Sequence, residues 1–219
     1  MNRVLILVLG FLSCSSVYAQ WSNEQADEAL ADIGNQKYTD LDSAITVCNS
    51  IADYYGSEEL PCKQSKAMAI LSSLYTRGAQ YERAMACIQS AKEIFDTSKC
   101  EDEYLAYIRL AQSNLNIELG EYERSDSIAH EAIRLYDSSP LDPVSLIKLY
   151  LNLGKGSRAL DIVLPYLDTA YQLAMRYQIQ QLEQKALIDI GSSYAMNDSI
   201  GLAKEYLKLA LKLARKRDR

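Results

Sequence analysis

The chain has 219 residues and is acidic, with 29 Asp and Glu against 23 Lys and Arg and a formal net charge of −6 at pH 7. Nucleic-acid binding depends on positive charge gathered against phosphates. The sequence has no such patch apart from a basic C-terminal end, which the dipole of a final helix accounts for. We therefore expect no nucleic-acid partner. A chain of this length can bury a substantial core, in one domain or two.

The first residues have the form of an export signal. A short positive segment precedes an apolar run, Val4–Leu12, and Val17-Tyr18-Ala19 places small residues where a signal peptidase needs them. The run is far shorter than the roughly 20 residues of a membrane-spanning helix, and no later stretch is long and charge-free enough to span a bilayer. We expect residues 1–19 to be cleaved as a signal peptide and the mature chain to be exported to the periplasm. A lipid anchor at Cys14 is the alternative.

A repeat of about 40 residues organises 20–219. Each unit is predicted to contain two helices joined by a short polar turn, and no run alternates as a strand would. The residues just ahead of the second helices are Leu41, Tyr81, Tyr122, Leu164 and Ile200, at spacings of 40, 41, 42 and 36. The sequence therefore predicts an all-α domain of about five helical hairpins.

In chain order, the predicted units are 22–57, 61–97, 101–138, 143–178 and 181–215. The first opens on a capping box, Ser22-Asn-Glu-Gln25. Pro61 and Pro143 stand where the second and fourth units begin, and Pro165 stands where the second helix of the fourth unit is expected to begin. The third opens on acidic residues 101–103, which the dipole of a helix start favours.

Small and apolar residues recur at three- and four-residue intervals and form one packing stripe on each helix. A single hairpin has too little core of its own, so neighbouring hairpins must stack. The residues expected to pack the repeats together are Ala44, Tyr75, Ala84, Ala91, Ala132, Tyr171, Ala174, Gly191, Tyr194, Ala203, Leu207 and Ala210.

This pattern resembles the tetratricopeptide repeat (TPR) family. The resemblance is clearest in 187–214, which contains Ile190-Gly191-x-x-Tyr194, and in 68–96, which contains Leu71 and Tyr75. It covers nearly all of 20–219, although the units are longer than usual and the third and fourth fit only with altered turns. It implies a right-handed superhelix whose first helices line a concave groove for a peptide or a partner's helix.

The resemblance also implies which residues face the groove. They are Lys66, Ser73, Thr76 and Arg77 in the second unit and Lys185, Ser192 and Met196 in the fifth. Family members that clamp a C-terminal carboxylate carry Lys and Asn at first-unit positions where this chain has Ala29 and Ile33. That class of partner is therefore not implied.

Four cysteines follow the predicted signal peptide: Cys48, Cys62, Cys87 and Cys100. An oxidising compartment permits disulfides, but four cysteines allow three pairings, and the sequence does not choose among them. Paired or not, they can also serve as small core residues. No Cys-x-x-Cys pair is present, so a zinc ribbon or a thioredoxin-type site is not indicated.

No catalytic constellation appears in the sequence. Gly154-Lys-Gly156 follows a helical pattern rather than the strand that a dinucleotide loop needs, and His130 is a lone histidine expected at the surface. Four Asp-Ser/Thr-apolar triplets, the first at 42–44, resemble an O-glycosylation signal, but such residues also suit helix starts. We expect no enzyme activity, no cofactor and no metal.

The sequence thus favours a protein-interaction module or scaffold of the bacterial cell envelope. It also resembles the exported halves of membrane-spanning TPR regulators, so a periplasmic sensor or regulatory half is the alternative. A helical repeat protein that binds a small ligand is a third reading. The partner and the oligomeric state are not indicated.

Overall fold

The structure is a computed structural model that describes residues 21–34, 40–136 and 142–217. The predicted signal peptide and Cys14 lie outside this range. The described helices are α1 (Asn23–Gly34), α2 (Leu41–Ser57), α3 (Pro61–Arg77), α4 (Tyr81–Ser98), α5 (Asp102–Glu118), α6 (Tyr122–Tyr136), α7 (Pro143–Leu153), α8 (Leu160–Arg176), α9 (Gln180–Met196) and α10 (Ile200–Arg217). No strand occurs among the described residues, and the all-α prediction is confirmed.

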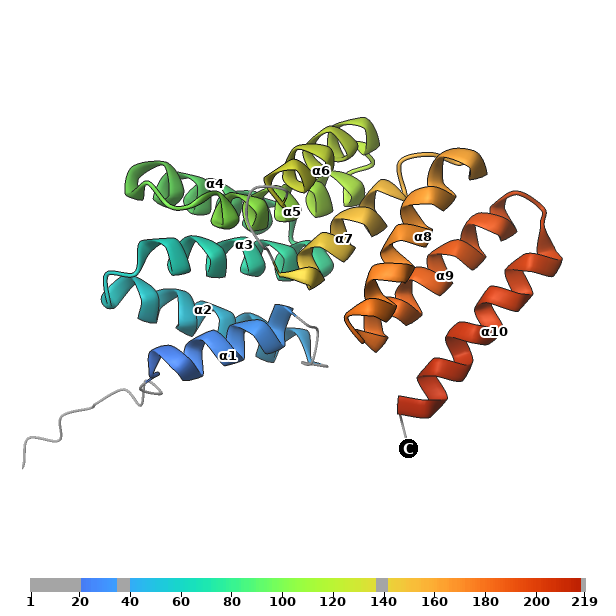
Figure 1. The fold of residues 1–219 in the computed structure, drawn as a ribbon. Helices are drawn as coiled ribbons and strands as arrows, with labels where there is room; N and C mark the ends of the chain where they lie inside the picture. Colours follow the sequence, from blue (N-terminus) through green and yellow to red (C-terminus); the bar gives the residue numbers. More distant parts are fainter. Residues whose placement is uncertain (1–20, 35–39, 137–141, 218–219) are drawn as a thin grey trace, which may run out of the picture.

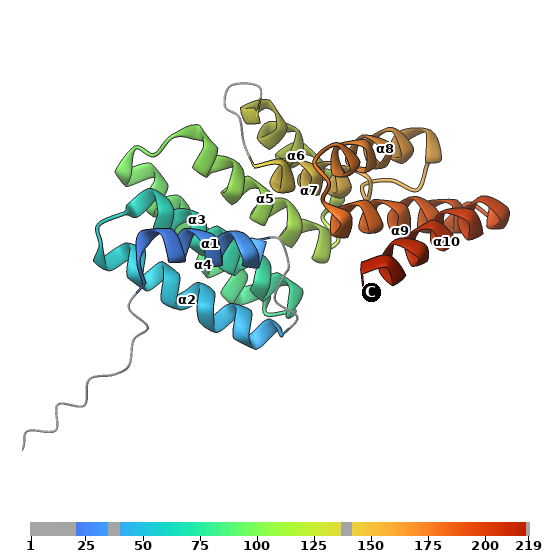
Figure 2. The same cartoon turned by 60° about the horizontal axis from the view of Figure 1, so that its bottom comes forward.

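The ten described helices pack in consecutive pairs, which follow one another from α1 and α2 to α9 and α10 (Figure 1). The odd-numbered helices also pack against each other, with α3 against α5, α5 against α7, and α7 against α9. They form one row through the molecule, which Figure 2 shows from a second side. The first helices of neighbouring hairpins therefore share one surface.

Most helix starts lie where the sequence predicts them. Ser22 and Gln25 form the capping box, since the Gln25 amide donates to Ser22 Oγ at 3.2 Å and the Ser22 amide donates to Gln25 Oε1 at 3.1 Å. Pro61 and Pro143 are the first residues of α3 and α7. Four of the five residues predicted ahead of second helices are the first residues of α2, α4, α6 and α10.

The second helix of the fourth unit differs from its prediction. α8 begins at Leu160 rather than near Leu164, and Pro165 lies inside the helix instead of opening it. The added first turn carries Val163, whose side chain is 1 % exposed. Burial of this side chain favours the added turn and offsets part of the cost of a proline inside the helix.

Six of the described turns, three within hairpins and three between them, share one backbone feature. In each of these turns one residue that follows the helix has a positive φ. These residues are Glu59, Ala79, Lys99, Gly120, Gln178 and Asp198. In five of these turns the next amide donates to the carbonyl five residues earlier, as Gln80 N does to Tyr75 O at 2.9 Å. This is the hydrogen bond of a Schellman motif, which usually places glycine at the left-handed residue. Only Gly120 is a glycine here.

The predicted packing residues lie between the helices. The alanines and Gly191 of that set are buried, and the tyrosines are half-buried. Leu207 is 41 % exposed, because one side of α10 is not covered by another described helix. Its other side lies against Gly191, where an added Cβ would meet Leu207 Cγ at 2.9 Å. At Gly154 a Cβ would meet the Leu167 side chain. Both glycines allow two helices to approach closely.

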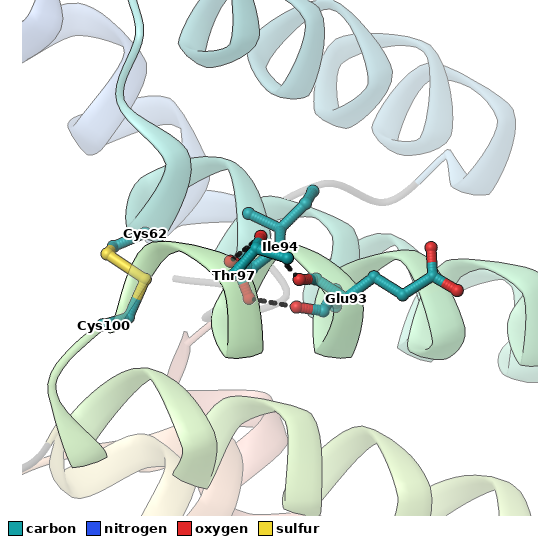
Figure 3. The surroundings of a disulfide bond; sticks show 7 residues. Cys62, Glu93, Ile94, Thr97 and Cys100 are labelled. Carbon is teal, nitrogen blue, oxygen red and sulfur yellow. Dashed lines mark hydrogen bonds between the residues drawn. A yellow bond between two sulfur atoms is a disulfide. The ribbon is translucent and has the colours of Figure 1, made fainter.

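Two of the four cysteines form a disulfide. Cys62, in the first turn of α3, is bonded to Cys100, which directly precedes the N-cap of α5, with a Cα–Cα distance of 5.5 Å (Figure 3). Cys48 and Cys87 are free and buried, and burial raises their pKa values to about 12 and about 11. The disulfide therefore encloses nearly the whole second hairpin and ties it to the next first helix.

Candidate functional site

A groove of about 590 Å³ lies on the surface shared by the odd-numbered helices. Its described lining residues come from α1, α3, α5, α7 and α9 and from the residues that flank α7. The even-numbered helices contribute none of them. Because each hairpin presents only its first helix, the groove is continuous across all five hairpins.

Five of the seven residues predicted to face the groove line it, and these are Lys66, Ser73, Thr76, Arg77 and Lys185. Ser192 and Met196 lie on α9 outside the groove, and Met196 is 62 % exposed. Within the described residues no further first helix follows α9, so nothing forms an opposite wall at these two positions. The structure therefore does not include them in the cavity.

A chain of hydrogen bonds crosses the floor of the groove from α3 to α7. Asn114 Nδ2 on α5 donates to Ser73 Oγ on α3 at 3.2 Å. Asn152 Nδ2 on α7 donates to Asn114 Oδ1 at 2.8 Å and to Ser113 Oγ at 3.0 Å. Ser113 Oγ in turn lies 2.9 Å from Ser125 Oγ on α6. These bonds fix three first helices relative to one another, so the groove is formed before any ligand arrives.

The groove is positively charged although the chain as a whole is acidic. Its described lining includes five cationic side chains and two carboxylates. The cations are Lys66, Arg77, Lys148, Lys155 and Lys185, and the carboxylates are Glu118 and Asp142. A formal excess of three positive charges therefore lies in a molecule whose net charge is −6.

Burial stabilises the neutral form of three of these lysines. It lowers the pKa of Lys148 to about 8, against an opposing effect of Asp142. Burial also lowers the pKa of Lys66 and that of Lys155, and the nearby Lys185 lowers the latter further. A cation that has lost part of its water without an equivalent replacement has lost solvation energy, which a new anionic partner restores.

The five cations differ in the partners they already have. Lys66 Nζ lies 4.4 Å from the centre of the Tyr107 ring, a cation–π contact. Lys185 Nζ is paired with Asp189 at 3.0 Å. Arg77 and Lys155 make no side-chain hydrogen bond or ion pair with any described residue. The groove thus offers cationic groups for which an incoming anion does not have to displace an existing partner.

Sequence reasoning missed the part of the groove that the fourth unit supplies. Lys148, Asn152 and Lys155 lie on α7 or just after it, in the fourth unit, which fits the repeat only with an altered turn. The available signal was Gly154-Lys-Gly156, which follows α7 as a turn and not as a dinucleotide loop.

Other candidate chemistry is sparse in the described part of the chain. It contains no group of three or more His, Cys, Asp or Glu side chains placed to hold a metal ion. His130 is exposed, with its ring at the edge of Tyr166 at 5.8 Å. Among the helices that the structure describes, none combines the length and apolar character needed to cross a bilayer.

No protein-family model matches the chain, and no curated protein does. The groove and its charges must therefore be interpreted from the geometry alone.

Proposed function

We propose that the chain is a non-enzymatic protein-interaction module with a TPR-like superhelical arrangement, which holds a peptide or a partner's helix in its groove. The observation that carries this proposal is the groove itself, whose described lining comes from the first helices of consecutive hairpins and the residues that flank α7. Repeat solenoids use such extended concave surfaces for binding. The lining groups are cations, amides, hydroxyls and apolar side chains, which suit recognition.

The rigidity of the floor supports a binding role. The Ser73–Asn114–Asn152 hydrogen bonds hold α3, α5 and α7 in place. A ligand that enters a preformed groove does not have to order the helices first, and this raises affinity. Ile70 and Tyr107 are half-buried on the same surface and supply apolar contact area.

The proposed place of action is the cell envelope, and the periplasm in particular. The Cys62–Cys100 disulfide supports this location, because disulfides persist in oxidising compartments and are rare in the cytosol. The export signal expected from the sequence is consistent with the same location.

Site-specific photocross-linking tests the proposal. A benzophenone amino acid placed at Ile70 in the groove is expected to cross-link to a protein of the envelope fraction. The same amino acid at Met85, which is 49 % exposed on α4 and does not line the groove, serves as the matched control. Equal adducts from both positions, or none from Ile70, would refute the proposal.

A small anionic ligand is the second candidate. The groove volume of about 590 Å³ favours it, because it falls within the range of small-molecule pockets, roughly 300–1,000 Å³. This candidate predicts a saturable rise in melting temperature with a metabolite library and no protein adduct at Ile70.

A further inference from the structure

We propose that the occupant of the groove is an acidic peptide segment in which carboxylates alternate with apolar side chains. This inference rests on the proposed function and specifies the chemistry of the ligand. It follows from where the cations of the groove lie, how far apart they are, and what lies between them.

The sign of the charge selects an anion. Only two carboxylates line the described groove beside five cations, while the whole chain carries an excess of acidic residues. The surrounding negative charge disfavours the long-range approach of a large polyanion, whereas a short segment meets the positive field of the groove. Complementary charge of this kind speeds encounter and selects among partners.

The spacing of the cations selects an extended segment over a single carboxylate. Lys66 and Arg77 are eleven residues apart on α3, which places them about 16 Å apart along the helix axis. An extended peptide needs about five residues to cover that length. Lys185 belongs to α9, three first helices further along the row, so one small anion cannot reach all of these cations.

Apolar surface between the cations selects a peptide over a nucleic acid. Ile70, which is only half-buried, lies between Lys66 and Arg77 on α3, and the half-buried ring of Tyr107 on α5 lies beside Lys66. A nucleic-acid strand would require phosphate contacts along its length and stacking platforms. Alternating acidic and apolar side chains satisfy both kinds of lining group.

The partly desolvated lysines also favour a carboxylate ligand. Burial lowers the pKa of Lys66 and of Lys155, and Lys155 has no ion-pair partner among the described residues. A carboxylate that enters beside them supplies charge-assisted hydrogen bonds where water is already reduced.

The test measures binding of the full-length chain to a fluorescent pool of acetylated peptides of about ten residues, in which Asp or Glu alternates with Leu, Ile or Val. A matched pool carries Asn or Gln in place of the acids. We expect the acidic pool to bind at least about tenfold more tightly. We expect Lys66→Gln or Lys155→Gln to weaken binding of the acidic pool about fivefold. Lys92→Gln, on an exposed face of α4 outside the groove, is expected to leave it unchanged.

Equal affinity for the two pools, no binding of either, or an equal loss in Lys92→Gln would overturn the inference. Tighter binding of single-stranded oligothymidine than of the acidic pool would also overturn it, in favour of a nucleic acid. Circular dichroism shows whether each variant is folded, and Lys155→Gln, which removes no side-chain hydrogen bond or ion pair to a described residue, keeps the test decisive. A protein adduct at Ile70 without preference for the acidic pool would leave the proposed function standing and remove only the acidic ligand.

Discussion

Removal of the Cys62–Cys100 disulfide should lower the free energy of unfolding by an amount that the length of the closed loop sets. The two cysteines are 38 residues apart. In the chain-entropy model a loop of this size removes about 13 cal/mol/K from the unfolded state, which corresponds to about 4 kcal/mol at room temperature. Domains of this kind are stable by only about 5–15 kcal/mol, so the change is large.

The assay is urea unfolding followed by helical circular dichroism, with wild type and the Cys62→Ala/Cys100→Ala variant compared. A slope of about 2 kcal/mol per molar urea converts the loss into a midpoint shift of about 2 M. Wild type treated with a reductant should unfold at nearly the same midpoint as the variant, because in both proteins only the cross-link is missing. The buried thiols of Cys48 and Cys87 are common to all samples and do not affect the comparison.

Two results would refute this reasoning. If reduction leaves the wild-type midpoint unchanged while the double variant is destabilised, the loss comes from side-chain packing and not from the closed loop. If neither perturbation shifts the midpoint, the loop does not constrain the unfolded chain.

Three further predictions follow from other sites. Ala79→Gly should raise the free energy of unfolding by about 1 kcal/mol in the same urea assay, because Ala79 has a φ of 54° that glycine adopts without strain; a loss of stability would contradict this. Gly154→Ala should lower the free energy of unfolding by about 1–3 kcal/mol, since a Cβ there meets a leucine of the next helix. Gly201→Ala, where a Cβ meets nothing within 4 Å, should leave the free energy of unfolding unchanged or raise it slightly. A thermal melt that ranks these two variants in the reverse order would show that the close approach is not real. Burial lowers the pKa of Lys148 from 10.5 to about 8, so the unfolded state binds more protons between these values and stability should rise with pH through that window. The stability gained in Lys148→Met relative to wild type should therefore shrink from about 3 kcal/mol near pH 7 to about 1 kcal/mol near pH 9.5, and a gap independent of pH would refute the shifted pKa.

The positions of the helices were largely predictable from local sequence. Leu41, Tyr81, Tyr122 and Ile200 each follow a short polar turn and open an apolar stripe, and each is the first residue of a second helix. The exception is α8, where Pro165 has the form of a first-turn proline. Its true place depends on the burial of a side chain in the preceding turn, which is a tertiary effect that no local signal reports.

The sequence predicts where the turns lie but not their backbone conformation. Sequence reasoning looks for glycine at the left-handed residue after a helix, and five of the six positions described here are occupied by other residues. The hydrogen bonds of the motif, together with packing on both sides, hold these residues in an unfavourable conformation. Propensity alone would have missed all but Gly120.

Part of the groove could be predicted from the sequence. The groove positions of the second unit follow from its clear register, whereas Lys148 and Lys155 were hidden by the irregular turn after α7. The disulfide pairing depends on α3 and α5 lying side by side, which brings Cys62 and Cys100 together. Contacts between units decide both features, and the spacing of residues within one unit does not contain them.

The disulfide also sets how the molecule responds to mechanical load. Stacked hairpins contact only their neighbours, so a chain pulled by its two ends unravels hairpin by hairpin. Between Cys62 and Cys100 the tension passes through the covalent bond, and the residues enclosed between these two cysteines, 38 positions apart, bear none of it. At about 3.4 Å per residue, roughly 130 Å of chain therefore stays hidden when the rest is fully extended. The second hairpin becomes a shielded segment, and its length is released only when a reductant cuts the bond.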